Sequence, residues 1–147
     1  MSKSTVQTEI SINNTPEAVI AYVADVNNRP LFLASLKSVS DIEGEPLAVG
    51  TTWRWIWDML GAEFEGSGRC LAHDPGQRYS FTTEGGISST FTYEATATDA
   101  GTSLTIRVEF EAPDSLLSRM GVDSLLESLK QGDAEKAAQN LKVILDT

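Results

Sequence analysis

Between residues 36 and 112 the chain alternates apolar and polar residues in short runs, and this pattern constrains the fold more than any other feature. Successive side chains of a strand point to opposite faces of a sheet, so each run predicts a strand with one buried face. Turn-forming residues such as Asp74-Pro75-Gly76 and Asp99-Ala100-Gly101 separate the runs. Short connections of this kind join antiparallel neighbours. We expect an antiparallel meander with strands near 36–43, 51–59, 62–72, 77–84, 89–98 and 102–111.

A strand and two short helices are expected before the meander. The segment 5–12, TVQTEISI, alternates like the later strands. Thr15-Pro16-Glu17 then predicts a helix start, with an N-cap threonine, a proline at the first helical position and an acidic residue in the first turn. This helix should end near Asp25. Pro30 interrupts the pattern, and a second short helix is expected over residues 31–34.

A long amphipathic helix is expected to close the chain. After Pro113, apolar residues recur at spacings of three and four, with weak points at Gly121 and Gly132. Strands followed by helices favour an α+β fold in which the helix lies on one face of the antiparallel sheet. A strongly twisted seven-stranded sheet tends to curl around whatever covers its concave face. The length of 147 residues fits a single domain, 1–147.

Composition limits the partners. The formal net charge of −10 repels phosphate backbones and anionic lipids, which argues against nucleic-acid binding. No apolar run approaches the ~20 residues that span a bilayer, so stable membrane insertion is not expected. The N-terminal residues lack the apolar centre of a secretory signal, and Cys70, the single cysteine, allows no intrachain disulfide. These absences favour a cytoplasmic protein. The sequence leaves open whether it is a monomer or a homodimer.

The phrase TPEAVIAYVADVNNRPLF at 15–32, several shorter phrases and the element order resemble the SRPBCC superfamily, which contains the START and birch-pollen-allergen-like proteins. The nearest branch is the polyketide cyclase/dehydrase-like group. The phrase at 15–32 matches the Pro-Glu helix start and the later Asp of the family, but Phe32 stands where a tryptophan is typical. The resemblance implies a helix-grip fold, in which a curved seven-stranded sheet wraps around the long helix and leaves a cavity for a hydrophobic molecule. It does not imply one chemistry. Further matching phrases are 50–52, 74–78, 101–105 and 140–146.

Three tryptophans, Trp53, Trp55 and Trp57, occupy alternate positions and must share one face of a strand. In a hairpin with matched faces, Gly66 and Gly68 of the next strand lie beside them, where a glycine leaves room for an indole to lie flat. Three interpretations remain open. The rings fill a core, or they line a ligand cavity, or they form an exposed interface with a partner.

The same alternation predicts which residues line a cavity. Tyr79, Tyr93, Arg54 or Arg69 could supply its few polar groups. Both arginines, however, point away from the Trp face, and cross-strand pairs with Glu63 or Glu65 are the simpler expectation. The predicted cavity residues are Trp53, Trp55, Trp57, Phe64, Tyr79, Phe81, Phe91, Tyr93, Ile106, Val108, Phe110, Leu126, Leu129 and Leu141.

No catalytic signature is present. His73 is expected in a surface turn, Cys70 on the inward face as inert packing, and no G-x-S-x-G motif occurs. Metal-ligand spacing is absent, and neither a metal nor a cofactor is expected. The leading hypothesis is a protein that binds a hydrophobic or aromatic small molecule, lipid- or polyketide-like. The first alternative is a polyketide cyclase or dehydratase that uses Tyr79, Tyr93 or His73 as acid or base, and the second is an interaction protein with the Trp row as its interface.

Overall fold

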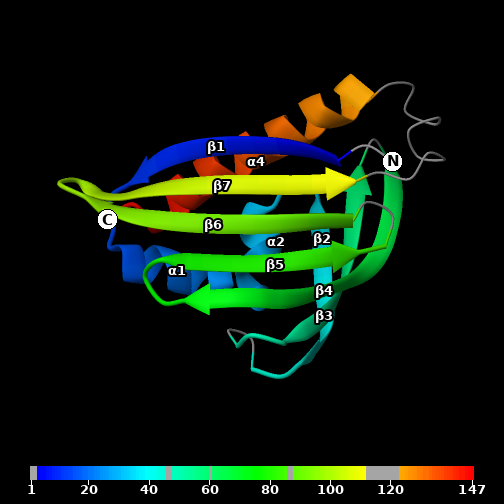
Figure 1. Ribbon diagram of the computed structural model, residues 1–147, viewed down its shortest axis with the longest axis horizontal. Coiled ribbons are helices and arrows are strands. Elements are labelled where there is room, and N and C mark those ends of the chain that lie inside the picture. The colour runs from blue at the N-terminus through cyan, green and yellow to red at the C-terminus, as the bar shows by residue number, and fades with distance from the viewer. Residues whose placement is uncertain (1–2, 46–47, 60, 86–87, 112–122) are drawn as a thin grey trace.

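The computed structural model describes residues 3–45, 48–59, 61–85, 88–111 and 123–147. Its strands form one antiparallel sheet in the order β1-β7-β6-β5-β4-β3-β2. Figure 1 shows the sheet bending so strongly that β2 runs across the direction of β5 and β6. The predicted meander is therefore confirmed. The strands are β1 (Lys3–Ile12), β2 (Leu36–Glu43), β3 (Thr52–Met59), β4 (Ala62–Asp74), β5 (Arg78–Glu84), β6 (Ser88–Thr98) and β7 (Gly101–Glu111).

The helices lie on one side of this sheet, behind it in Figure 1. The long helix α4 packs against β1, β7 and α2, as the helix-grip fold requires. The predicted α+β architecture, with two short helices after the first strand, is thus confirmed. The expected helical stretch between Pro113 and Gly121 lies outside the described residues. The helices are α1 (Pro16–Ala24), the 3-10 helix η1 (Val26–Asn28), α2 (Arg29–Phe32) and α4 (Asp123–Leu145).

The caps of the short helices explain where they begin. Thr15 caps α1 by accepting a hydrogen bond from the backbone N–H of Ala18 at 3.2 Å. The second helix begins at Arg29, two residues earlier than predicted. Pro30 falls in its first turn, where a missing N–H leaves no helical hydrogen bond unmade. This proline therefore opens the helix instead of interrupting it.

The β3–β4 hairpin has the predicted matched faces. Trp53 pairs with Gly68, and Trp55 pairs with Gly66. A Cβ atom at Gly68 would lie within 2.6 Å of three atoms of the Trp53 indole. The indoles therefore lie flat over the glycine backbone, in space that any other residue would fill.

A bulge in β4 changes which side chains face inward after Cys70. The register with β5 shifts between Cys70 and Ala72, so that His73 pairs with Tyr79. The His73 ring lies edge-on to the Tyr79 ring at 5.8 Å. The prediction of a surface-turn histidine is therefore wrong, because the extra residue at the bulge turns His73 to the inner face within the strand.

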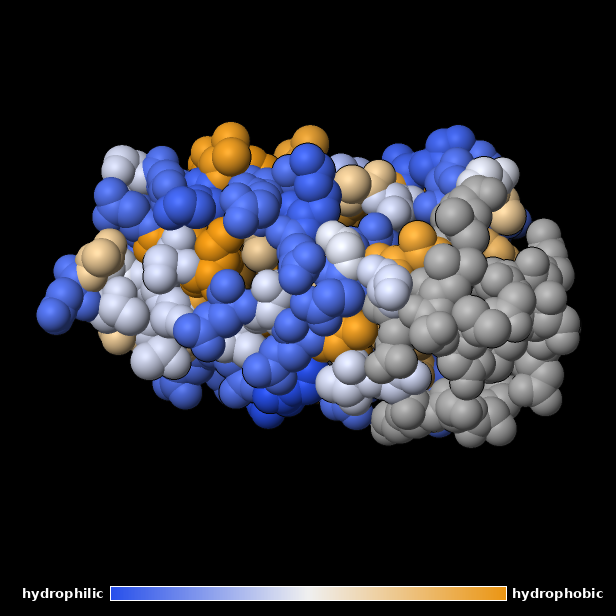
Figure 2. All heavy atoms as spheres, turned by 90° about the horizontal axis from the view of Figure 1, so that it is seen from above, coloured by the Kyte–Doolittle hydropathy of each residue, from blue (hydrophilic) through white to orange (hydrophobic). Residues whose placement is uncertain are grey.

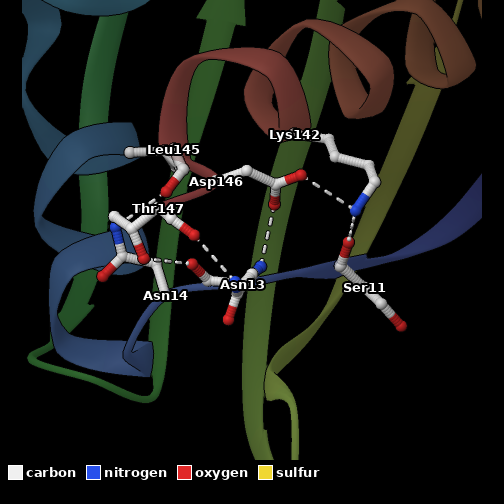
Figure 3. Close-up of polar contacts among 7 residues, drawn as sticks. All are labelled: Ser11, Asn13, Asn14, Lys142, Leu145, Asp146 and Thr147. Atoms are coloured by element: carbon white, nitrogen blue, oxygen red, sulfur yellow. Dashed lines mark hydrogen bonds and ion pairs between the residues drawn. The ribbon is translucent and has the colours of Figure 1, made fainter.

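Hydrogen bonds fasten the end of α4 to the turn between β1 and α1 (Figure 3). The side-chain amide of Asn14 donates to the carbonyl of Leu145 at 2.8 Å, and the backbone N–H of Asn13 donates to Asp146 at 2.8 Å. Lys142 donates to the carbonyl of Ser11 at 2.9 Å. The bond from Asn14 satisfies a helix-terminal carbonyl that has no partner inside the helix, and together the three bonds fix α4 across the sheet. We call this cluster the α4 latch.

Replacing Asn14 by alanine should lower the free energy of unfolding by about 1 kcal/mol, because the carbonyl of Leu145 loses its donor. Chemical denaturation measures the loss, and amide hydrogen exchange should show faster opening of the last turn of α4. Asn27 is the matched control, since its exposed side-chain amide bonds, among the described residues, only to nearby Asp25. Equal losses for the two alanine variants would contradict a role for the α4 latch.

The face seen from above Figure 1 is mostly hydrophilic, with separate apolar patches (Figure 2). Among the described residues, no helix is both long and apolar enough to cross a membrane. Arg54 and Arg69 are exposed, and neither forms an ion pair with a described residue. The expected pairs with Glu63 or Glu65 are wrong for the described part of the chain, because Lys37 of β2 forms the ion pair with Glu63.

Candidate functional site

Two small cavities lie between the sheet and α4. The first has a volume of about 30 Å³ and the second about 10 Å³, which is room for single water molecules. Trp57, Phe91 and Lys130 line both, so these three side chains divide one interior space. The first cavity is also lined by Trp55, Phe64, Thr83 and Ser89, and the second by Leu33, Tyr93, Ile106, Val108, Asp133, Ala134 and Ala137.

The structure places about half of the predicted cavity residues on these walls. Trp55, Trp57 and Phe64 come from the β3–β4 hairpin, and the remainder from β6 and β7. The side chain of Leu126 lies outside the described residues. The other predicted residues belong to the surrounding core and line neither cavity: Trp53, Tyr79, Phe81, Phe110, Leu129 and Leu141.

The three tryptophans play different parts. Trp53 and Trp55 are 3% and 6% exposed and belong to the core, so they cannot form an exposed interface. Nε1 of Trp55 donates to the carbonyl of Ser67 at 2.8 Å, which holds that indole in place. Trp57 is half-buried, and its Nε1 has no hydrogen-bond partner in the described structure. No hydrogen bond to a described residue therefore fixes the position of the Trp57 indole.

Lys130 is the charged group at the centre of the site. Its side chain is 5% exposed, and Nζ lies 5.0 Å from the ring centre of Trp57 and 5.9 Å from those of Phe91 and Phe110. The faces of aromatic rings attract a cation, and this attraction partly offsets the hydration that the ammonium loses on burial. No carboxylate of the described residues lies within ion-pair distance of Nζ. Burial lowers the pKa of Lys130 to about 8, against the opposing influence of the Asp133 charge.

Asp133 lies one turn further along α4 and also lines the second cavity. Its carboxylate accepts a hydrogen bond from the hydroxyl of Ser35 at 3.2 Å. Burial raises the pKa of Asp133, while Lys130 and the Ser35 hydroxyl act in the opposite direction. Burial therefore shifts the pKa of both Lys130 and Asp133 in the direction that favours the uncharged form. Shifts of this kind are common at ligand-binding and catalytic sites.

Of the three acid–base candidates, only Tyr93 lines a cavity; Tyr79 and His73 do not. The hydroxyl of Tyr93 is buried and has no partner among the described residues. Burial raises the pKa of both phenols, so both remain protonated at neutral pH. A cyclase or dehydratase reaction at these residues stays a prediction.

Arg29 forms a second buried cationic centre beneath the core aromatics. It is 1% exposed, and its guanidinium carbon lies 4.0 Å from the ring centre of Phe81 and 4.8 Å from that of Trp53. Nε donates to the carbonyl of Val23 at 3.2 Å, at the C-terminal end of α1, where the helix dipole favours a cation. Nη2 donates to the Tyr79 hydroxyl. Arg29 therefore joins α1 to the sheet and lines neither cavity.

Sequence reasoning missed Lys130, Asp133 and Arg29. A signal for Lys130 was present, because the helical stripe through Ala134, Ala137 and Leu141 continues backwards by four residues to Lys130. Lysines are seldom fully buried, so the stripe by itself predicts a buried face of apolar residues only. Cys70 is buried as predicted, and burial raises the pKa of its thiol. Within the described residues, no three His, Cys, Asp or Glu side chains are grouped to hold a metal.

The family model described as "Polyketide cyclase / dehydrase and lipid transport" matches residues 3–145. The chain belongs to this family. The resemblance to the SRPBCC superfamily is thereby confirmed. No curated protein sequence matches this chain significantly.

Solved structures share the fold of this polyketide cyclase-like protein at low sequence identity. TTHA0849 from Thermus thermophilus is 20% identical with a TM-score of 0.77, over 95% of this chain and 94% of that one. The Zhui aromatase/cyclase from Streptomyces sp. R1128 is 16% identical with a TM-score of 0.78, over 98% and 94%. The ginseng major latex-like protein 151 from Panax ginseng is 14% identical with a TM-score of 0.74, over 97% of each chain. Identities at this level show a common fold only.

Proposed function

We propose that this protein binds an apolar or aromatic small molecule in the space that Trp57, Phe91 and Lys130 now divide. One observation carries the proposal: the aromatic wall contains buried polar groups without partners. Nε1 of Trp57 and the hydroxyl of Tyr93 have none among the described residues. Buried polar atoms in folded proteins are nearly always hydrogen-bonded. A ligand with oxygen atoms on an apolar body would supply a partner to the Tyr93 hydroxyl and cover the rings that stay in place.

The present cavities are far smaller than the several hundred Å³ of a typical ligand site, so a ligand must displace a side chain. Trp57 is the candidate, since it lines both cavities, is half-buried and lacks a hydrogen bond to hold its indole. Its cross-strand neighbour is Phe64, which is also half-buried. Outward rotation of Trp57 would join the two cavities and free the volume of an indole. We call this pair the Trp57–Phe64 gate.

The family supports the proposal in general terms. Its description names polyketide cyclisation and lipid transport, and the Zhui structure is that of an aromatase/cyclase. Both kinds of protein handle largely apolar molecules. The sequence-based alternative of an exposed Trp interface has less support, because Trp53 and Trp55 are buried.

N-phenyl-1-naphthylamine, a neutral dye that fluoresces in apolar surroundings, tests the proposal. The protein should bind it saturably, and Trp57→Ala should tighten binding by about tenfold, equivalent to about 1.4 kcal/mol, because no indole then has to be displaced. Trp53→Phe is the matched control, since Trp53 lines neither cavity, and its affinity should stay near that of the parent. Absence of saturable binding to both the parent and Trp57→Ala would overturn the proposal.

A further inference from the structure

We propose that the cavity selects apolar acids, and that Lys130 binds the carboxylate of the ligand. This inference rests on the proposed function, because it names the chemical class that the same site accepts. The ligand would be an aromatic or aliphatic monoacid, with its apolar body among the rings and its single negative charge at Nζ.

The position of Lys130 is the first argument. It is 5% exposed, lines both cavities and forms no ion pair or hydrogen bond with a described residue. A buried ammonium normally has a carboxylate partner, since its hydration is lost on burial. The contacts it makes with described residues are to ring faces 5.0 to 5.9 Å away, and none of these accepts a conventional hydrogen bond from its three donors. A ligand carboxylate would supply the missing charge and accept those donors.

The gate is the second argument. The indole that lies over Nζ is that of Trp57, the residue whose displacement would open the cavity. Outward rotation of Trp57 therefore removes one of the ring faces that attract the ammonium. The positive charge is then less well stabilised than when Trp57 lies over it. An anionic ligand replaces what the ammonium loses, whereas a neutral ligand of the same shape does not. The acid therefore stabilises the open state of the cavity more than a neutral ligand of the same shape does.

The net charge of the protein is the third argument. At −10 the protein repels anions at long range, so its general field disfavours an acidic ligand. Tighter binding of an acid than of its neutral ester must then come from a local cation. Within the two cavity walls, Lys130 is the described residue that carries a positive charge.

The test compares 2-naphthoate with its methyl ester as competitors of N-phenyl-1-naphthylamine at pH 7 and low salt. The acid should displace the dye at least tenfold more tightly than the ester. In Lys130→Met this preference should disappear, so that acid and ester compete equally or the ester competes better. Lys136→Met is the matched control, because Lys136 is exposed on the same helix, and it should keep the full preference.

Each outcome decides one of the two proposals. If dye and ester bind the parent but the acid binds no better, the acid selectivity is overturned and the general ligand site stands. The same conclusion follows if Lys130→Met keeps the preference. If neither the dye nor either competitor binds the parent, the ligand site itself is overturned. The parent comparison of acid with ester decides the matter even if a variant fails to fold.

Discussion

Replacing Gly68 by alanine is expected to lower the free energy of unfolding by about 3 kcal/mol, the upper end of the usual cost of overpacking. The new Cβ would lie within 2.6 Å of three atoms of the Trp53 indole. That indole is 3% exposed and packs against Phe81 and the guanidinium of Arg29, so it has little room to move aside. Chemical denaturation followed by circular dichroism measures the loss.

A double-mutant cycle identifies the cause. The three atoms nearest to the new Cβ all belong to Trp53, so in a Trp53→Leu background the same alanine should cost much less. Gly132→Ala is the control for the change of residue type alone. This glycine lies in α4 with no atom within 4 Å of the added Cβ, and its replacement should stabilise the protein by about 0.5–1 kcal/mol. A Gly68→Ala loss that is unchanged in the Trp53→Leu background would show that the indole is not the obstacle.

Replacing Lys130 by methionine is expected to raise the free energy of unfolding at pH 7. Burial lowers the pKa of Lys130 from 10.5 to about 8. At 1.36 kcal/mol per pKa unit this shift corresponds to a cost on the order of 3 kcal/mol for keeping the charged form in the folded protein. Methionine has a similar shape and no charge, so it removes this cost. We expect a gain of about 1–3 kcal/mol by chemical denaturation.

The pH dependence gives a second readout. Between about pH 8 and 10.5 the unfolded chain holds a proton on Lys130 that the folded chain has released. The Lys130 contribution to the stability of the parent protein should therefore rise with pH across this window, whereas the raised pKa of the buried Cys70 thiol acts in the opposite direction above about pH 9. Asp133 on α4 and Tyr93 on β6 are the other described titratable groups of the second cavity, and burial raises the pKa values of both.

This contribution of Lys130 should be absent in Lys130→Met, so the difference in stability between the two proteins should shrink above pH 8 and disappear only above about pH 10.5. Lys136→Met should retain the slope of the parent, because Lys136 is exposed. Parallel curves for the parent and Lys130→Met would contradict the assignment of the slope to Lys130. A stabilised variant that has also lost its preference for acids would show that the buried charge is kept for binding at the expense of stability.

Local patterns in the sequence were enough to place the elements and most of the sheet. Strand alternation is a local property, because one face of each strand must be buried, and it located β2 to β7 to within about two residues. The cap at Thr15 is equally local. Trp53 and Trp55 could be matched to Gly68 and Gly66 because a short hairpin fixes its own register. Family resemblance then supplied the helix-grip arrangement.

Which of these side chains form the site depended on contacts between distant parts of the chain. The bulge between Cys70 and Ala72 depends on how β4 meets β5, and it turned His73 inward against the expected alternation. Nε1 of Trp55 reaches the carbonyl of Ser67 on the neighbouring strand, whereas Nε1 of Trp57 has no partner among the described residues. No alternation within a single strand could have predicted either outcome.

The two buried charged residues are the clearest case of positions that the sequence alone could not predict. Arg29 and Lys130 look like solvated residues in the sequence, since charged side chains are seldom buried. In the fold, Arg29 meets the end of α1 and the Tyr79 hydroxyl, and Lys130 meets three ring faces brought together from β3, β6 and β7. The alternation of each strand determined that those rings point inward. That they surround a cation depended on where α4 crosses the sheet, because the free energy of a buried charge is set by all of its neighbours at once.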